Sequence, residues 1–342
     1  MSSLAPMTVD EEFMREAILE ARKGTGRTHP NPAVGAVIVS GGRVVARGWH
    51  RGAGHSHAEI EALKKAGNVA GGATLYVTLE PCSTHGRTPP CTESIVQARF
   101  RRVVYGATDP NPKHSGRARA ILARAGIEVC SGVLESRCTA VNTAWNKWIA
   151  TGMPFVTAKA AMTLDGRINS PPEGRWISSE ASRRDVMKLR SRVHAILVGG
   201  ETLRVDDPQL TVRGIRTPVQ PLRVIWTKSG RLPKTARIFT DEHRDRTVVF
   251  RDVSLRSVLR ELGRREIASV LIEGGARVLG EAFDRSLVDE VYFYLAPALA
   301  GGPVPVVGGR GAPDVQGAIR LGEPVFKRIG SDVRLTGAVV RT

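Results

Sequence analysis

The sequence predicts an α/β protein with two different domains. At 342 residues, the chain is longer than a usual single domain. Strand-like and helix-like segments alternate through both halves, which is typical of mainly parallel sheets covered by helices. We place the seam in "WNKWIATGMPF", residues 145–155, because a strand-like pattern starts again after it. The expected domains are residues 1–148 and 149–342, and no internal repeat relates them.

The first domain is expected to begin with a helix and to continue with alternating strands and helices. Thr8 and Glu11 form a capping-box pattern, in which two residues bond each other's backbone N–H groups at a helix start. A Gly-Gly turn then joins two strands within residues 32–49. Further strands are expected at 73–79, 101–107 and 127–133, and further helices at 57–67, 92–100 and 116–126.

The second domain repeats this alternation with more strands. A helix is expected at 183–193, and strands at 155–162, 194–200, 222–227, 246–250, 269–275 and 290–297. No Gly-x-Gly-x-x-Gly fingerprint of a Rossmann fold occurs in this half. Instead, "LIEGGARVLG" predicts a strand, a Gly-Gly turn and a helix, and the helix N-terminus there suits a dinucleotide phosphate.

Composition argues against several classes of protein. Four cysteines are too few for a disulfide scaffold, and no apolar run is long enough to span a membrane. The N-terminus lacks the basic and apolar regions of a signal peptide. The formal net charge is +17, but the cations are spread along the chain and aromatic residues make up only 5%. We therefore expect a cytoplasmic protein that binds small anions, with neither nucleic acid nor a membrane as partner.

Two cysteines, Cys82 and Cys91, form a candidate metal site with His57. One imidazole and two thiolates are good zinc ligands, and a catalytic zinc keeps its fourth position for water. Glu59 follows His57 by two residues, so that it can reach the water without binding the metal. His-x-Glu followed by Pro-Cys and a later Cys is the signature of zinc deaminases.

Motifs spread over nearly the whole chain carry a family resemblance. In the first half they are "THPNPAVGAVIV", "GAGHSHAE", "TLEPCS" and "DPNP", with eight residues between the two cysteines. In the second half they are "KAAMTLDGRI", "RWISSEASRRDV", "HAILVGGETLRVDDPQLTVR", "LIEGGARVLGEAF" and "LAPALAGG". In this order they resemble the bifunctional deaminase–reductase family of riboflavin biosynthesis.

The resemblance implies a fold, a reaction and two cofactors. The first domain would be a zinc cytidine-deaminase-like α/β/α sandwich, and the second a dihydrofolate-reductase-like α/β domain that uses NADPH. The enzyme would hydrolytically deaminate 2,5-diamino-6-(5-phosphoribosylamino)pyrimidin-4(3H)-one and then reduce its ribosyl side chain to ribityl. A homo-oligomer, either a dimer or a tetramer, is also expected.

In the deaminase, the resemblance assigns the zinc to His57, Cys82 and Cys91 and the proton transfers to Glu59. The residues that match the substrate site are Asn31, Arg87, Asp109 and Asn111. Asn31 and Asn111 each precede a proline, so a plain turn is the alternative role for both. The chain departs from the family at Thr84, His85, His114 and Ala118. Thr84 stands where a histidine is usual, with His85 next to it, while His114 and Ala118 replace an apolar residue and a glycine.

In the reductase, the residues that match the cofactor site are Ala161, Trp176, Thr202, Asp206, Gly275, Ala276, Arg277, Val278 and Leu279. Those that match the substrate site are Lys159, Gly174, Arg190, Leu210, Arg213 and Glu273. The two arginines suit a ribose phosphate, and Glu273 and Asp206 could bind hydroxyl groups or assist proton transfer. Gly174 replaces a usual serine. For the 2′-phosphate of NADPH, we expect Lys228 and Arg231 to supply the positive charge.

Other interpretations of these patterns stay open at this point. A disulfide between the two cysteines is one, and a structural zinc with His55 or His85 as a fourth ligand is another. Trp176 could be a core or interface aromatic residue, and Asp206 a turn residue. The net charge favours a nucleic-acid deaminase, although such enzymes usually carry Cys-x-x-Cys. The departures at Thr84 and Gly174 favour a zinc-containing binding protein without catalysis.

Overall fold

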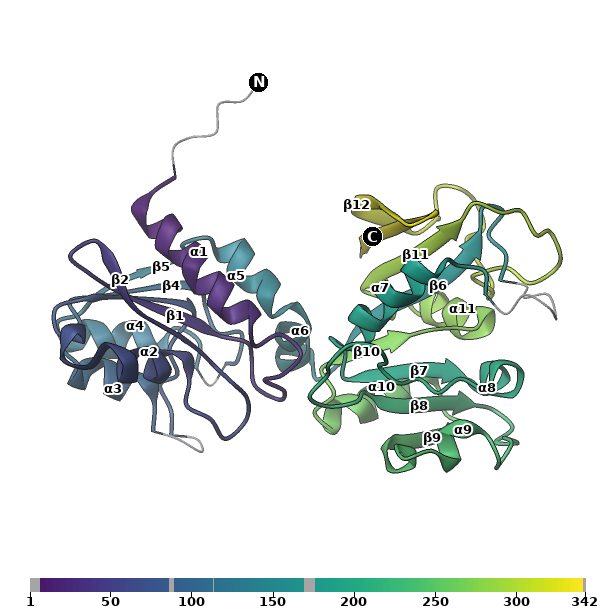
Figure 1. Cartoon of the computed structure of the whole chain (residues 1–342), viewed down its shortest axis with the longest axis horizontal. Coiled ribbons are helices and arrows are strands. Elements are labelled where there is room, and N and C mark those ends of the chain that lie inside the picture. Colours follow the sequence, from purple (N-terminus) through teal and green to yellow (C-terminus); the bar gives the residue numbers. More distant parts are fainter. Residues whose placement is uncertain (1–6, 86–88, 113, 169–175, 341–342) are drawn as a thin grey trace, which may run out of the picture. The chain divides into compact units, whose positions relative to one another are not determined.

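The computed structural model describes residues 7–85, 89–112, 114–168 and 176–340. The chain divides into two compact units, Met1–Thr151 and Gly152–Thr342, and each is built on its own sheet (Figure 1). The predicted two-domain α/β architecture is therefore confirmed. The stretch where we placed the seam contains an unexpected helix, α6 (Thr143–Thr151), at the end of the first unit.

The first unit contains a five-stranded sheet with the strand order β2-β1-β3-β4-β5. The strands are β1 (Gly35–Ser40), β2 (Arg43–Trp49), β3 (Thr74–Leu79), β4 (Arg102–Ala107) and β5 (Glu128–Ser131). β1 runs antiparallel to β2 and β3, whereas β3, β4 and β5 are parallel. The turn between β1 and β2 needs its two glycines, because Gly41 and Gly42 have φ angles of 56° and 73°.

Helices cover both faces of this sheet, as expected for an α/β/α sandwich. The helices are α1 (Val9–Arg22), α2 (Ala58–Ala66), α3 (Cys91–Gln97), α4 (Arg117–Arg124) and α5 (Glu135–Val141), with a short 3₁₀ turn, η1 (Gly67–Ala70). α2, α3 and α4 lie on one face and α1 and α5 on the other (Figure 1). Successive strand residues point to opposite faces, so Ile38 packs with the first group and Val37 with the second.

The second unit contains an eight-stranded sheet with the order β12-β13-β11-β6-β10-β7-β8-β9. The strands are β6 (Phe155–Thr163), β7 (Ala195–Gly199), β8 (Leu222–Thr227), β9 (Thr247–Arg251), β10 (Ser269–Ile272), β11 (Glu290–Ala296), β12 (Arg320–Ile329) and β13 (Asp332–Val340). The first six of these are parallel neighbours and correspond to the expected strands. The hairpin of β12 and β13 was not predicted, because β12 is mostly exposed and lacks a buried alternating pattern.

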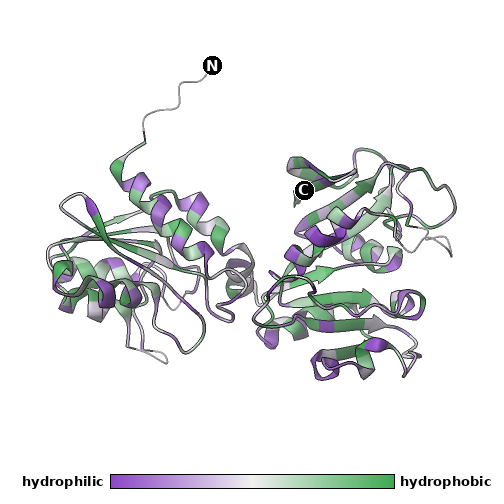
Figure 2. Ribbon diagram, viewed as in Figure 1, coloured by the Kyte–Doolittle hydropathy of each residue, from purple (hydrophilic) through white to green (hydrophobic). Residues whose placement is uncertain are grey.

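The helices of the second unit pack their apolar sides on the two faces of this sheet. They are α7 (Glu180–Arg190), α8 (Gly200–Asp206), α9 (Arg237–Thr240), α10 (Leu255–Arg264) and α11 (Ala276–Asp284), with the 3₁₀ turn η2 (Arg244–Arg246). α10 and α11 bury residues in the core cluster on one face, and α8 and α9 do so on the other. Figure 2 shows mainly hydrophobic strands, and helices that carry both hydrophobic and hydrophilic residues. No helix within the described residues is long and apolar enough to cross a membrane.

The predicted capping box at the start of α1 is present, and it gives a test of local stability. The Glu11 N–H donates to Thr8 Oγ1 at 3.3 Å, and the Thr8 N–H donates to Glu11 Oε2 at 2.9 Å. Thr8→Ala should destabilise the first turn by about 1 kcal/mol, because it leaves an N–H without its acceptor. Hydrogen exchange at the Glu11 amide should become faster. Thr8→Ser, which keeps the hydroxyl, should exchange like the natural protein; equal exchange in Thr8→Ala would contradict the role of the cap.

Candidate active site

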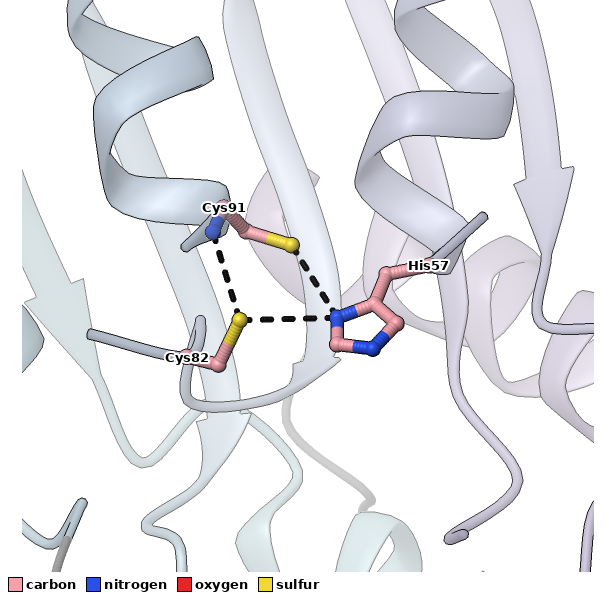
Figure 3. Close-up of side chains that lie close together, drawn as sticks. All are labelled: His57, Cys82 and Cys91. Carbon is pink, nitrogen blue, oxygen red and sulfur yellow. Dashed lines mark hydrogen bonds between the residues drawn. The ribbon is translucent and has the colours of Figure 1, made fainter. Parts of the chain in front are cut away.

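A metal-ligand set lies beside the carboxyl end of β3, in the first unit. His57 is the N-cap residue of α2, Cys82 follows β3, and Cys91 is the first residue of α3. His57 Nδ1 lies 3.2 Å from Cys91 Sγ and 3.4 Å from Cys82 Sγ (Figure 3). The imidazole makes no capping bond to its own helix and points instead to the two sulfurs. Three segments of the chain thus bring their ligand atoms to one point.

The geometry of these three residues fits a zinc ion. Typical zinc–sulfur and zinc–nitrogen bonds in a tetrahedral site put the ligand atoms about 3.6 Å apart. The observed separations of 3.2 and 3.4 Å are close to that spacing, and all three ligand atoms lie within 4.8 Å of one another. Among the described residues, neither His55 nor His85 joins this group. Three protein ligands without a fourth are the arrangement of a catalytic zinc rather than of a structural one.

The three groups of the set are coupled through their protons. Hydrogen bonding from Cys91 and from His57 lowers the pKa of Cys82 to about 4, and the Cys91 N–H also donates to its sulfur at 3.2 Å. The hydrogen bond with Cys82 raises the pKa of His57 to about 9, and the same thiolate, together with burial, raises the pKa of Cys91. The Cys91 thiol and the His57 ring thus share their protons with the Cys82 thiolate. A divalent cation displaces such protons when it binds.

Glu59 lies in the first turn of α2, next to this set. Its side chain is only 5% exposed, and burial raises the pKa of its carboxyl group. The charges of His57 and Cys82 act on it, and it interacts with Cys91. A carboxyl group with a raised pKa can both accept and return a proton near neutral pH. Glu59 therefore stands beside the ligands without being one of them.

Asn31 is tied to the loop that leads to His57. Its Nδ2 lies 3.0 Å from His50 Nε2, and His50 Nδ1 lies 3.0 Å from the carbonyl oxygen of Ser56. A carbonyl only accepts, so His50 carries its proton on Nδ1 and accepts from Asn31 through Nε2. Burial lowers the pKa of His50, which agrees with this neutral form. The side-chain carbonyl oxygen of Asn31 takes no part in this hydrogen bond.

The other residues expected at the deaminase substrate site lie after β4 or outside the described residues. Asp109 is buried, burial raises its pKa, and it accepts from the Asn111 N–H at 2.8 Å. Arg87 lies outside the described residues. Two of the residues that depart from the family pattern contact each other: Thr84 Oγ1 lies 3.2 Å from His114 Nδ1. An imidazole is therefore present next to position 84, but it comes from the loop after β4.

In the second unit, a buried ion cluster joins three of the expected substrate residues. Arg190, at the end of α7, donates through Nε and Nη2 to Glu273 at 2.6 and 2.8 Å. Lys159 Nζ, from β6, lies 4.0 Å from the same carboxylate. The pKa of Glu273 is lowered by these cations against the opposing effect of burial, and burial lowers the pKa of Lys159. Arg190 also donates to the carbonyl oxygen of Thr211, and Arg213 donates to the hydroxyl group of Thr211 at 3.0 Å.

The expected cofactor residues gather around two turns that lie next to each other. The N–H of Gly199, the last residue of β7, donates to the carbonyl oxygen of Gly274 at 3.2 Å. A Cβ on Gly275 would lie 3.2 Å from Thr202 Oγ1, so the start of α8 approaches the start of α11 closely. Ala161 lies on β6, Thr202 and Asp206 lie on α8, and residues 275–279 form the start of α11.

The other expected residues of this unit differ in their exposure. Trp176 is 59% exposed, with the guanidinium group of Arg183 at 5.0 Å from its ring centroid, so it is no core residue of this unit. Leu210 is buried. Lys228 and Arg231 follow β8 and are exposed, and their contact with a 2′-phosphate stays a prediction. Gly174 lies outside the described residues.

The first unit combines a zinc-ligand set with a buried glutamate on an α/β/α sandwich, and a second α/β domain follows in the same chain. These features define a two-domain protein with a zinc deaminase as its first domain. Residues 7–107 match the family model of the cytidine and deoxycytidylate deaminase zinc-binding region. Residues 154–335 match the model of the RibD C-terminal domain. The chain is similar to riboflavin biosynthesis protein RibD of Bacillus amyloliquefaciens, at 38% identity over 96% of both chains. It is also similar to that of Escherichia coli K12, at 37% identity over 95% of this chain and 98% of that protein.

Solved structures agree with these matches. Acinetobacter baumannii RibD superposes with a TM-score of 0.90 at 36% identity, covering 97% of this chain and 99% of that chain. A diaminohydroxyphosphoribosylaminopyrimidine deaminase/5-amino-6-(5-phosphoribosylamino)uracil reductase from Thermotoga maritima has a TM-score of 0.88 at 36% identity, with the same coverage. The chain belongs to the RibD family of riboflavin biosynthesis. It is a bifunctional deaminase and reductase, with zinc and NADPH as cofactors.

The resemblance, the fold class and the bifunctional activity expected from the sequence are thereby confirmed. Two buried polar residues, His50 and Glu80, had no expected role, although both stand within or next to the quoted motifs. Glu80 follows a strand and precedes Pro81-Cys82. The apolar pattern of that strand does not explain a carboxylate at its end. That position was the available signal.

The ion cluster of the second unit predicts a pH-dependent stability. Glu273→Gln leaves two buried cations without their counter-charge, which should destabilise this unit by about 3–5 kcal/mol at pH 7. The folded-state pKa of Glu273 is lowered, so its stabilisation is present above the ordinary glutamate pKa and is lost as the pH falls through the folded value. The difference between variant and natural protein should therefore shrink in acid.

Urea unfolding of both proteins at neutral and acidic pH measures this difference. Glu281→Gln, which breaks an exposed pair with Arg285 at 3.1 Å, is the control and should change stability by less than about 1 kcal/mol. Equal stability at pH 7, or a difference that widens in acid, would show that Glu273 does not neutralise the cluster.

Proposed function

We propose that His57, Cys82 and Cys91 hold the catalytic zinc of the deaminase and that Glu59 carries its protons. The proposed substrate is 2,5-diamino-6-(5-phosphoribosylamino)pyrimidin-4(3H)-one. The observation that supports this most is the three-ligand set with a buried glutamate next to it. A zinc ion in such a site supplies an activated water for hydrolysis at neutral pH.

The chain's own residues have separate tasks in this reaction. Glu59 accepts a proton from the attacking water and gives it to a ring nitrogen of the pyrimidine. It then accepts the second proton from the hydroxyl group now on the carbon and gives it to the amine, so that the C–N bond breaks, ammonia leaves and the carbonyl group forms. Asn31, Asp109 and Asn111 bind the base and the ribose phosphate, with Arg87 as a further cation. The site is partly closed, because Glu59 and Asp109 are both buried, and low exposure excludes bulk water from the proton transfers.

In the second domain, Lys159, Arg190, Arg213 and Glu273 are proposed to bind the deaminated intermediate. NADPH, when bound at the turns before α8 and α11, supplies the reducing equivalent. Arg190 already donates to Glu273 and to Thr211, so the exposed Arg213 is better placed to meet the substrate phosphate. Glu273 and Asp206 would bind hydroxyl groups of the sugar or assist proton transfer.

We further propose a cellular location and an oligomeric state for the enzyme. We place the enzyme in the cytoplasm, because the four cysteines are free thiols and the ligand set requires reduced sulfur. We also propose a homo-oligomer, a dimer or a tetramer. Val325 and Phe326 on the edge strand β12 are 57% and 67% exposed, which would suit burial against a second copy.

Metal analysis tests the ligand assignment directly. The purified protein should contain roughly one zinc per chain, and Cys82→Ser should lose most of it, because two ligands hold zinc far more weakly than three. Cys130→Ser, at a thiol outside the ligand set, should keep the metal. Full zinc occupancy in Cys82→Ser would remove that residue from the site.

The proton role is tested by Glu59→Gln. This variant should keep zinc, fold and reductase activity, while ammonia release falls by about 10⁴-fold, because one residue serves several proton transfers. Glu61→Gln, on the same helix, should release ammonia at nearly the natural rate. Both activities are measured on the same preparation, with the already deaminated uracil phosphate as the reductase substrate. Near-normal ammonia release in Glu59→Gln would mean that Glu59 only supports the start of α2.

A further inference from the structure

Glu80 is a buried carboxylate at the edge of the first sheet, next to the metal-ligand set. It follows the last residue of β3, and its side chain is 3% exposed. Its N–H donates to the carbonyl oxygen of Ala107 at 2.8 Å, which extends the pairing of β3 with β4 by one residue. The backbone of Glu80 is therefore held in the sheet, and Cys82 follows two residues later.

The Glu80 carboxylate accepts three backbone N–H groups, two from the loop after β4 and one from the first turn of α4. Oε2 accepts from Gly116 at 2.9 Å and from Asp109 at 3.3 Å, and Oε1 accepts from Ala118 at 3.1 Å. Hydrogen bonds to a charged acceptor are about twice as strong as those between neutral groups. A buried carboxylate also needs such donors, because it has left water. One side chain thus attaches both ends of the loop to the sheet.

Other hydrogen bonds among the described residues of this loop shape it internally. Asn111 donates from its N–H to Asp109, and His114 and Ser115 donate from theirs to the carbonyl oxygen of Asn111. These partners all belong to the loop itself. The Thr84–His114 contact joins it to the loop after β3 rather than to a strand.

We propose that Glu80 is a positioning residue of the deaminase, whose carboxylate holds both ends of the connection between β4 and α4 so that Asp109 and Asn111 meet the substrate. Glu80 does not touch the substrate in this role. The proposal rests on the proposed substrate contacts of that loop. Glu80 then has two positioning roles, because the same residue also fixes the start of the segment that carries Cys82.

Glu80→Gln tests the proposal with almost no change in shape. An amide has one acceptor oxygen, so its NH₂ group must face at least one backbone N–H. Losing a charge-assisted hydrogen bond should raise KM for deamination about tenfold or more, with kcat changed by less than about threefold. Zinc content and reductase activity on the deaminated substrate should stay natural. The Gly116 and Ala118 amides should exchange hydrogen faster. Glu128→Gln, at an exposed carboxylate on β5, is the control and should leave every value unchanged.

The outcomes separate this proposal from the proposed function. If the natural protein released no ammonia from the diaminopyrimidinone, the proposed function would be wrong. If it did so and Glu80→Gln kept KM and amide exchange unchanged, the role of Glu80 would be wrong. Faster exchange with an unchanged KM would show an anchored loop that does not position substrate groups, which also overturns the proposal.

A variant that does not fold still leaves a decisive measurement on the natural protein. Its Gly116 and Ala118 amides should be strongly protected from exchange, although only the second lies in a helix. Addition of the deaminated uracil phosphate should slow exchange at Asn111 further. The proposal would be contradicted if the Gly116 and Ala118 amides were unprotected, or if exchange at Asn111 did not change when that compound was added.

Discussion

The proposed deaminase site depends on the parallel pairing of β3 with β4. Leu79 lies opposite Ala107, so both strands end at the same edge of the sheet and their loops leave it side by side. The first loop carries Cys82, and the second carries Asp109. Because α2 and α3 begin next to this edge, their N-termini bring His57 and Cys91 to the same place and favour negative charge there. Without that pairing, residues from four segments would not meet.

The two domains neutralise buried charge in different ways. In the first, thiols and an imidazole share protons that a divalent cation displaces, so cation affinity at this set depends on pH. In the second, Glu273 pairs with Arg190 and lies 4.0 Å from Lys159, so one carboxylate offsets only part of the charge of two cations. The first set is therefore chemically suited to hold a metal ion. The second is an arrangement of side chains that already pair with one another.

Buried polar residues that hydrogen-bond the loops help to position them, as the loop residues themselves do. A loop has few apolar contacts, so its position is determined by the groups that accept its N–H donors. His50 links Asn31 to the backbone at Ser56, and Glu80 links the loop after β4 to the end of β3. Both residues are almost fully buried. Binding groups on loops thereby gain some of the rigidity of the sheet, which is what precise substrate positioning requires.

The sequence by itself determined the features that depend on near neighbours in the chain. The alternation of strands and helices, the capping box at Thr8 and the Gly-Gly turn of the first hairpin follow from local periodicity and backbone preference. The spacing of His57, Cys82 and Cys91 also identified a zinc-ligand set, because few chemistries require those residue types in that order.

Only the tertiary structure decided which distant groups meet. The hairpin of β12 and β13 joins the sheet beside β11, although β12 has too few buried residues to be recognised as a strand from its pattern. The contact of Thr84 with His114 and the bonds from Gly116 and Ala118 to Glu80 join residues about 30 or more positions apart. Such contacts depend on strand order and register, which are set by the packing of the whole domain and leave no periodic signal in the residues themselves.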